Sequence, residues 1–104
     1  TNTDLTLTAT DTIAISATLG QQTWRVQGNA AAISLSTTPF SATAVDGAML
    51  VFIGNHDTNT VTFTNNDASG GCVLNGNATL GKYDTLILQY LSAILRYVEV
   101  YRNF

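Results

Sequence analysis

The sequence predicts an all-β fold: an antiparallel β-sandwich or a jelly-roll-like barrel without substantial helix. Apolar residues alternate with Thr, Ser and other polar residues along short runs, and Gly and Asn separate these runs. No segment combines helical spacing with good caps, and the nearest one, residues 90–96, lies between two strand patterns. The chain has 104 residues, enough for one hydrophobic core but not two. We therefore expect residues 1–104 to form a single β domain.

The first half of the chain contains four strand candidates. Residues 5–9 and 13–17 alternate in the same way on either side of Asp11, which predicts two strands with a tight connection between them. Gly20 closes this hairpin-like unit. Residues 24–26 form the next candidate, with Trp and Val on one side and Arg on the other. Residues 33–35 form a fourth, shorter one. Thr favours strands because its branched Cβ fits the pleated surface.

The second half adds five strand candidates, at residues 49–53, 61–63, 72–74, 85–91 and 95–101. The pair Asn75-Gly76 is a strong signal for a two-residue hairpin turn. We expect positive φ at both residues, and a turn that fixes the register of the strands around Leu74 and Ala78.

Two of these runs, residues 49–53 and 86–88, are apolar at nearly every position. A strand with one face in the core and one in water should alternate instead. Alternation assigns five side chains to the internal core: Leu50, Phe52, Leu86, Leu88 and Tyr90. The opposite face then carries the candidates for a subunit interface, Met49, Val51, Ile53 and Ile87. A second copy of the chain is the simplest cover for this face; a closed barrel or an overlying loop of the same chain is the alternative.

Composition limits the function. Charged residues make up 11% of the chain, against about 25% in an average globular protein, and the formal net charge is −3. The four Lys and Arg residues are scattered, so we expect no nucleic-acid partner. No run approaches the ~20 apolar residues of a membrane-spanning helix, so we expect no membrane insertion. Cys72 has no partner for an internal disulfide and is interpreted as a small buried thiol.

No pattern predicts catalysis, a metal or a cofactor. His56 next to Asp57 lacks a specified nucleophile or second ligand, and a loop with turn-type hydrogen bonds is the better interpretation. Residues 65–70 resemble the start of a calcium loop, but Gly76 occupies the position that requires an acid. Three aromatic residues are candidates for ligand contact, because a ring with a polar edge can stack on a sugar: Trp24, Tyr83 and Tyr97. Packing in the core or at an interface is their alternative role.

Several segments together resemble a small β domain common in phage tail-fibre and other virion appendage proteins: Asp46-Gly47 and residues 54–62, 74–81, 84–88 and 98–102, with residues 25–28 and 35–40 before them. The resemblance covers most of the chain. It implies a virion location and a viral structural protein, the trimeric distal module of a phage tail fibre that supports host recognition. The implied partners are copies of the chain itself in a homotrimer, other virion proteins and a host cell-surface glycan.

At the positions of Met49, Val51 and Ile53 those proteins are often polar, so the apolar residues here fit an interface. Two other functions stay open. One is a trimeric capsid decoration, or cement, protein. The other is a carbohydrate-binding module of a secreted bacterial protein, which would need an exposed aromatic platform.

Overall fold

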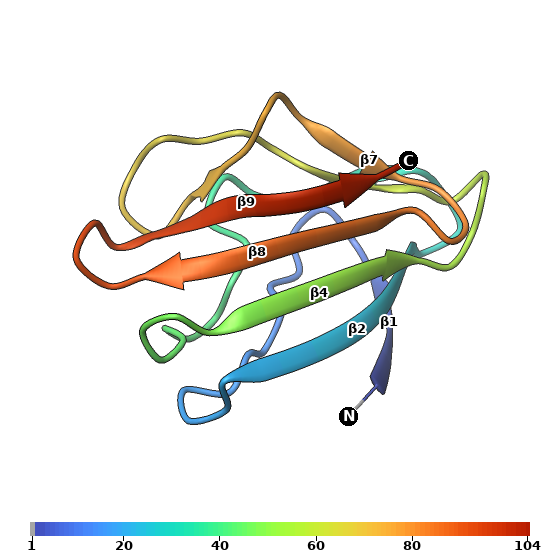
Figure 1. Ribbon diagram of the computed structural model, residues 1–104. Coiled ribbons are helices and arrows are strands. Elements are labelled where there is room, and N and C mark those ends of the chain that lie inside the picture. The colour runs from blue at the N-terminus through green and yellow to red at the C-terminus, as the bar shows by residue number, and fades with distance from the viewer. Residues whose placement is uncertain (1) are drawn as a thin grey trace.

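The computed structural model describes residues 2–104, and these residues form strands and loops with no helix (Figure 1). The strands are β1 (Asn2–Leu7), β2 (Gln21–Gly28), β3 (Ile33–Ser34), β4 (Met49–Gly54), β5 (Val61–Phe63), β6 (Cys72–Val73), β7 (Ala78–Leu80), β8 (Thr85–Leu91) and β9 (Arg96–Asn103). The all-β prediction is confirmed.

The strands make two sheets that pack face to face. The larger sheet has the order β1-β2-β4-β8-β9-β6, and the smaller has the order β3-β5-β7. Figure 1 shows β2, β4, β8 and β9 side by side, with the smaller sheet and the long loops behind them. The arrangement is a two-layer β-sandwich.

The strand pairing is mixed, so the prediction of a purely antiparallel sandwich is wrong in this respect. β1 with β2, β2 with β4, β6 with β9 and β3 with β5 are parallel, whereas β4–β8, β8–β9 and β5–β7 are antiparallel. Parallel neighbours need a crossover connection rather than a tight hairpin. Here the chain makes such crossovers through its long loops. One of them, between β2 and β4, also supplies β3 to the other sheet.

Residues 13–17 do not form the predicted second strand. Ile13 makes only an isolated parallel bridge with Phe40, and its N–H donates to Pro39 O at 2.8 Å. The side-chain amide of Gln22 takes the place of a neighbouring strand for Ser16: it accepts from Ser16 N at 2.7 Å and donates to Ser16 O at 3.1 Å. The apolar alternation of this segment therefore reflects insertion of Ile13 into the core from an irregular loop.

The predicted hairpin at Asn75-Gly76 is also wrong. Gly76 has φ +83°, as expected, but Asn75 is not among the residues with positive φ. The strands on either side belong to different sheets, because β6 pairs with β9 and β7 pairs with β5. The turn therefore carries the chain from one layer of the sandwich to the other and sets no hairpin register.

The core lies between the sheets and is centred on Phe52 of β4. Its ring stacks on Trp24 (centroids 5.0 Å apart, planes 9° apart) and packs against Phe63 of the smaller sheet at 4.7 Å. The five side chains that alternation assigned to the core are all buried: Leu50, Phe52, Leu86, Leu88 and Tyr90. The described buried apolar side chains form one cluster.

Candidate functional site

The outer face of the six-stranded sheet, the face turned away from the smaller sheet, carries all four interface candidates. Met49, Val51, Ile53 and Ile87 are half-buried, and the residues between them are buried in the core. In Figure 1 no described segment crosses in front of β4 and β8. The alternative in which the chain covers both of its own faces therefore does not hold for residues 2–104.

The strand register arranges this face into rows. Val51 lies opposite Thr23 on one side and Ile87 on the other, and Ile87 lies opposite Tyr101. The next row contains Met49 and, opposite Gln89, Val98 of β9. Side chains at directly opposed positions touch across the strands, so Val51, Ile87 and Tyr101 form one apolar row, whereas Gln89 lies between Met49 and Val98 in the next row.

Tyr101 and Val98 enlarge the patch beyond the sequence prediction. Between Ile87 and Leu88 the pairing with β9 shifts, so that these residues oppose Tyr101 and Glu99 and leave Val100 as the extra residue of a β-bulge. Val100 and Tyr101 are 53% and 51% exposed. Strict alternation along β9 would place Tyr101 on the same face as the buried Tyr97. The extra residue of the bulge reverses the faces after Val100, so Tyr101 lies on the outer face instead. Val98 precedes the bulge, and alternation along β9 from the buried Tyr97 would have found it.

The outer face of the smaller sheet is polar, in contrast. Ser34, Thr62 and Thr79 lie opposite one another across β3, β5 and β7. The hydroxyls of Thr62 and Thr79 are 2.8 Å apart and share a hydrogen bond. This sheet alternates apolar-in and polar-out, as a face in water should. Apolar outward-facing side chains are thus confined to the larger sheet and are not found on the outer face of the smaller one.

The three aromatic candidates for ligand contact lie in different places. Trp24 is 5% exposed and stacks on Phe52 inside the core. Tyr97 is 2% exposed, and its hydroxyl donates to Ala42 O and accepts from Ala44 N, both at 3.3 Å. Burial raises the pKa of this phenol. Tyr83 is 72% exposed in the turn before β8, with φ +70° and the ammonium of Lys82 5.2 Å from its ring centroid. The three rings do not form a common platform.

Tyr97 does line a cavity of about 310 Å³ at one end of the sandwich. The cavity lies between the loop before β4, the turn before β6 and the β8–β9 turn, and its lining residues are Thr38, Phe40, Ser41, Ala42, Thr43, Ser69, Gly70, Tyr90, Leu95 and Tyr97. A second hollow of about 350 Å³ lies beside β2, where Trp24 and Gln22 meet the irregular segment 14–19.

His56 and Asp57 both serve the loop between β4 and β5. His56 Nδ1 accepts from Thr58 N at 3.1 Å and from Asn59 N at 2.8 Å, so this nitrogen has no lone pair free for catalysis. Asp57 accepts from Lys82 N at 3.0 Å, and Asp84 accepts from Gly81 N at 2.8 Å. Asp57 thereby joins the β4–β5 loop to the turn between β7 and β8, and Asp84 stabilises that turn itself.

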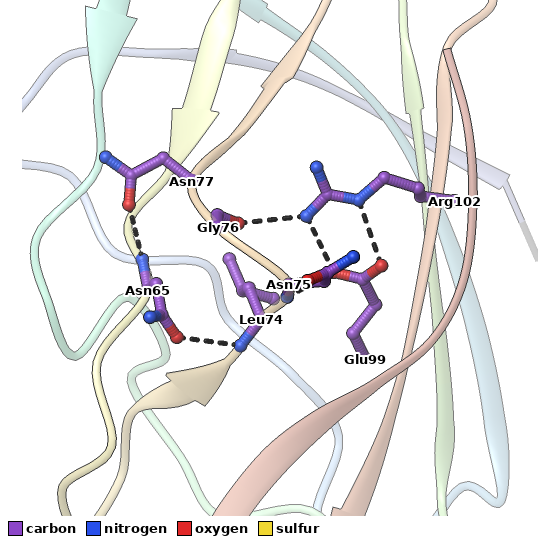
Figure 2. Close-up of polar contacts among 7 residues, drawn as sticks. All are labelled: Asn65, Leu74, Asn75, Gly76, Asn77, Glu99 and Arg102. Atoms are coloured by element: carbon purple, nitrogen blue, oxygen red, sulfur yellow. Dashed lines mark hydrogen bonds and ion pairs between the residues drawn. The ribbon is translucent and has the colours of Figure 1, made fainter.

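A third polar group, drawn in Figure 2, connects the β6–β7 crossover to β9. Arg102 donates to both oxygens of Glu99 (2.9 and 2.7 Å) and to Gly76 O (2.9 Å), while Glu99 also accepts from Asn75 N at 3.0 Å. The hydrogen bond from Arg102, with that from Asn75 N, holds the pKa of Glu99 below its ordinary value. The Glu99 side chain is only 13% exposed. Both carboxylate oxygens of Glu99 and the Nε and Nη2 atoms of Arg102 have partners within the chain, which indicates a structural role.

Within residues 2–104, no three His, Cys, Asp or Glu side chains come close enough together to hold a metal ion. Burial raises the pKa of Cys72 to about 12, so its thiol stays protonated. The described residues also include no helix that is long and apolar enough to cross a membrane.

Comparisons with protein-family models, with curated protein sequences and with solved structures gave no significant match.

Proposed function

We propose that this chain is a non-enzymatic structural module of a phage virion, which forms a homotrimer through the outer face of its larger sheet and supports host recognition from the tail fibre. One observation carries the proposal: the apolar patch of Met49, Val51, Ile53 and Ile87, extended by Val98 and Tyr101, has no cover within residues 2–104. The virion setting is supported by the resemblance of the turn and strand segments to those of appendage domains.

A second copy is the cover that best fits the size of this face. Strands spaced about 4.8 Å apart and rising about 3.3 Å per residue give a six-stranded face roughly 25 Å wide and 20–25 Å long. The accessible area of such a face exceeds its projected area and is therefore of the order of the ~800 Å² per partner that stable interfaces bury. Apolar centres with polar rims are typical of such interfaces.

Charge at the rim is compatible with burial. Arg25 donates to both oxygens of Asp4 at 2.7 Å, and this bidentate pair lies beside Ile53 on the β1–β2 side of the face. Because the two charges already neutralise each other, contact with another copy leaves no unpaired charge there. Three copies rather than two are proposed because the resemblance to tail-fibre domains implies a trimer.

Immunoelectron microscopy of virions of the parent phage tests the function. Antibodies raised against the purified chain should label the distal end of the tail fibres. Label spread over the capsid surface would instead support the decoration protein, and particles without label would contradict a virion role. The third function, a carbohydrate-binding module of a secreted protein, would need an exposed aromatic platform. Trp24 and Tyr97 are buried and do not provide one.

A further inference from the structure

We propose that Asn75-Gly76, in the crossover between β6 and β7, is a self-modification site at which the asparagine amide is converted to a carboxylate beside Glu99. The reaction is an intramolecular deamidation that consumes water and releases ammonia. The two residues form a turn that sets no hairpin register, and the proposed function gives them no other role. The proposal does not depend on that function, because every protein group it needs belongs to one chain.

The chemistry requires an asparagine side chain next to a backbone nitrogen that can reach it. Gly76 N attacks Cγ of Asn75, a C–N bond forms, and the bond from Cγ to Nδ2 breaks. The attacking nitrogen gives its proton to a solvent base, and Nδ2 departs as ammonia, which leaves a succinimide ring. Water then opens the ring at either carbonyl: breaking the new bond gives aspartate, and breaking the old peptide bond gives isoaspartate. Because both reacting atoms belong to neighbouring residues of one chain, the first step is unimolecular.

Both atoms that form the first bond are accessible in the folded chain. Asn75 and Gly76 are exposed, and no hydrogen bond joins the Asn75 side chain or Gly76 N to another group of residues 2–104. A Cβ on Gly76 would meet no atom within 4 Å, so the space around the turn is open to the ring and to water. Glycine has no side chain to obstruct the approach of its own nitrogen. The reaction therefore needs no unfolding of the chain.

The neighbouring asparagines are held in place instead. Asn77 Oδ1 accepts from Asn65 N at 2.8 Å, and Asn65 Oδ1 accepts from Leu74 N at 2.9 Å (Figure 2). These hydrogen bonds must break before either side chain can turn toward the next backbone nitrogen. Neither residue precedes a glycine, and Asn75 is the one asparagine in the sequence that does.

Asp46-Gly47 is the pair that most resembles Asn75-Gly76, since it could form the same ring with loss of water, and Gly47 also has positive φ (+81°). Here the fold prevents the reaction. Gly47 N donates to Tyr90 O at 2.7 Å, and Asp46 Oδ1 accepts from Ser92 N at 2.8 Å. The hydrogen bond from Ser92 N also lowers the pKa of Asp46, which keeps its carboxylate ionised and a poor target for a nucleophile. The folded chain thus blocks one pair and leaves the other open.

The new carboxylate changes the network of Glu99 and Arg102. The N–H of residue 75 donates to Glu99 Oε1 at 3.0 Å, and Gly76 O accepts from Arg102 Nη2 at 2.9 Å (Figure 2). A carboxylate on residue 75 therefore lies near that of Glu99, and nearby like charges disfavour each other. Isoaspartate also adds a methylene to the backbone of the short connection between the two sheets, residues 74–77. Both products should loosen the β6–β7 crossover.

The test is incubation of the pure full chain for weeks in warm neutral buffer, followed by peptide mass spectrometry and enzymatic detection of isoaspartate. The peptide that contains residue 75 should gain about 1 Da and carry the isoaspartate. A parallel incubation in urea gives the rates in the unfolded chain.

Because the turn is open, Asn75 should react in the folded chain within about threefold of its rate in urea. Asp46 is the matched control and should isomerise at least about tenfold more slowly in the folded chain than in urea. An Asn75 that stays intact in the folded chain while it converts in urea would overturn the proposal. Equal rates for Asp46 in the two conditions would contradict the structural contrast between the two pairs.

Variants separate the reaction from its consequence. Asn75→Gln keeps an amide but moves it one methylene away from the attacking nitrogen, so its peptide should keep its mass. Asn75→Asp carries the charge of one product from the start and should lower the Tm by a few degrees. In a Glu99→Gln background the same change should have little effect, because no second carboxylate remains. No loss of Tm, or an equal loss in both backgrounds, would contradict the placement of the new charge beside Glu99.

Discussion

At the residue scale, the side chains that most invited a chemical interpretation shape loops instead. The two backbone N–H groups that donate to His56 Nδ1 belong to the same loop, whose Asn59 O accepts a hydrogen bond from Gly28 N at 2.8 Å. The loop thereby fastens β4 to the end of β2. In the sequence, a histidine beside an aspartate looks like a catalytic pair. The two backbone N–H groups that donate to His56 Nδ1 identify the segment as a turn instead.

Replacing His56 tests this role. His56→Leu removes the acceptor from two N–H groups and should cost about 1–2 kcal/mol, since a hydrogen bond contributes about 0.5–1.5 kcal/mol. His56→Asn should stay near the parent, because its side-chain oxygen can accept from N–H groups two and three residues on. Urea unfolding of the three chains measures the difference. Equal stability of His56→Leu and the parent would contradict the assignment.

Gly76 is a second residue whose role depends on conformation. A Cβ there meets no atom within 4 Å, so any cost of substitution comes from its φ of +83°. Gly76→Val should cost about 1–3 kcal/mol and lower the Tm by at least about 4 °C. Gly20, which has equal space and no positive φ, supplies the control: Gly20→Val should cost much less. Two similar melting curves would refute strain at Gly76. Assembly should not change, because this turn sets no hairpin register.

At the element scale, the β6–β7 crossover is fastened to β9 by the ion pair of Glu99 and Arg102. The folded-state pKa of Glu99 lies below its ordinary value of 4.5. A depressed carboxyl pKa contributes stability that is fully present above the unfolded-state pKa and is lost as the pH falls through the folded-state value. The stability of the chain should therefore decline below about pH 4.5, partly because Glu99 becomes protonated.

Unfolding as a function of pH tests this contribution. Glu99→Gln should lower stability near pH 7 and flatten its decline below about pH 4.5, because the titrating group is gone. Asp4→Asn is the control: Asp4 also pairs with an arginine, but its side chain is 58% exposed, and such pairs contribute about 0–1 kcal/mol. An unchanged pH profile in Glu99→Gln would show that this network does not stabilise the fold.

The sequence predicted elements better than their connections. Alternation correctly separated core from outer face on β4 and β8, because each strand has one buried and one outward side. The parallel pairing of β1, β2 and β4 was not predictable, because nothing in a strand's own pattern encodes the direction of its neighbour. The loop role of residues 13–17 was hidden for a related reason: their missing strand partner is the side chain of Gln22. Likewise, the cavity joins Phe40, Ser69 and Leu95, which lie far apart in sequence.

At the scale of the whole molecule, the two outer faces predict opposite responses to charge. Val51→Lys places an ammonium at the centre of the apolar patch, where it can reach water in a single chain but not within an interface. An unpaired charge buried on assembly costs about 3–5 kcal/mol, so this variant should be monomeric and folded. Thr79→Lys, on the polar face of the smaller sheet, should assemble like the parent. Sedimentation velocity measures the mass of each variant. Equal masses for Val51→Lys and Thr79→Lys would show that the outer face of the larger sheet is not part of the interface.

The most direct test of the central claim is the mass of the unmodified chain in dilute solution, measured by multi-angle light scattering after size exclusion. If copies cover the outer face of the larger sheet, the particle at micromolar concentration should have about three times the mass of the 11.0 kDa chain. A stable, non-aggregating species of 11.0 kDa at that concentration would contradict the proposed trimer.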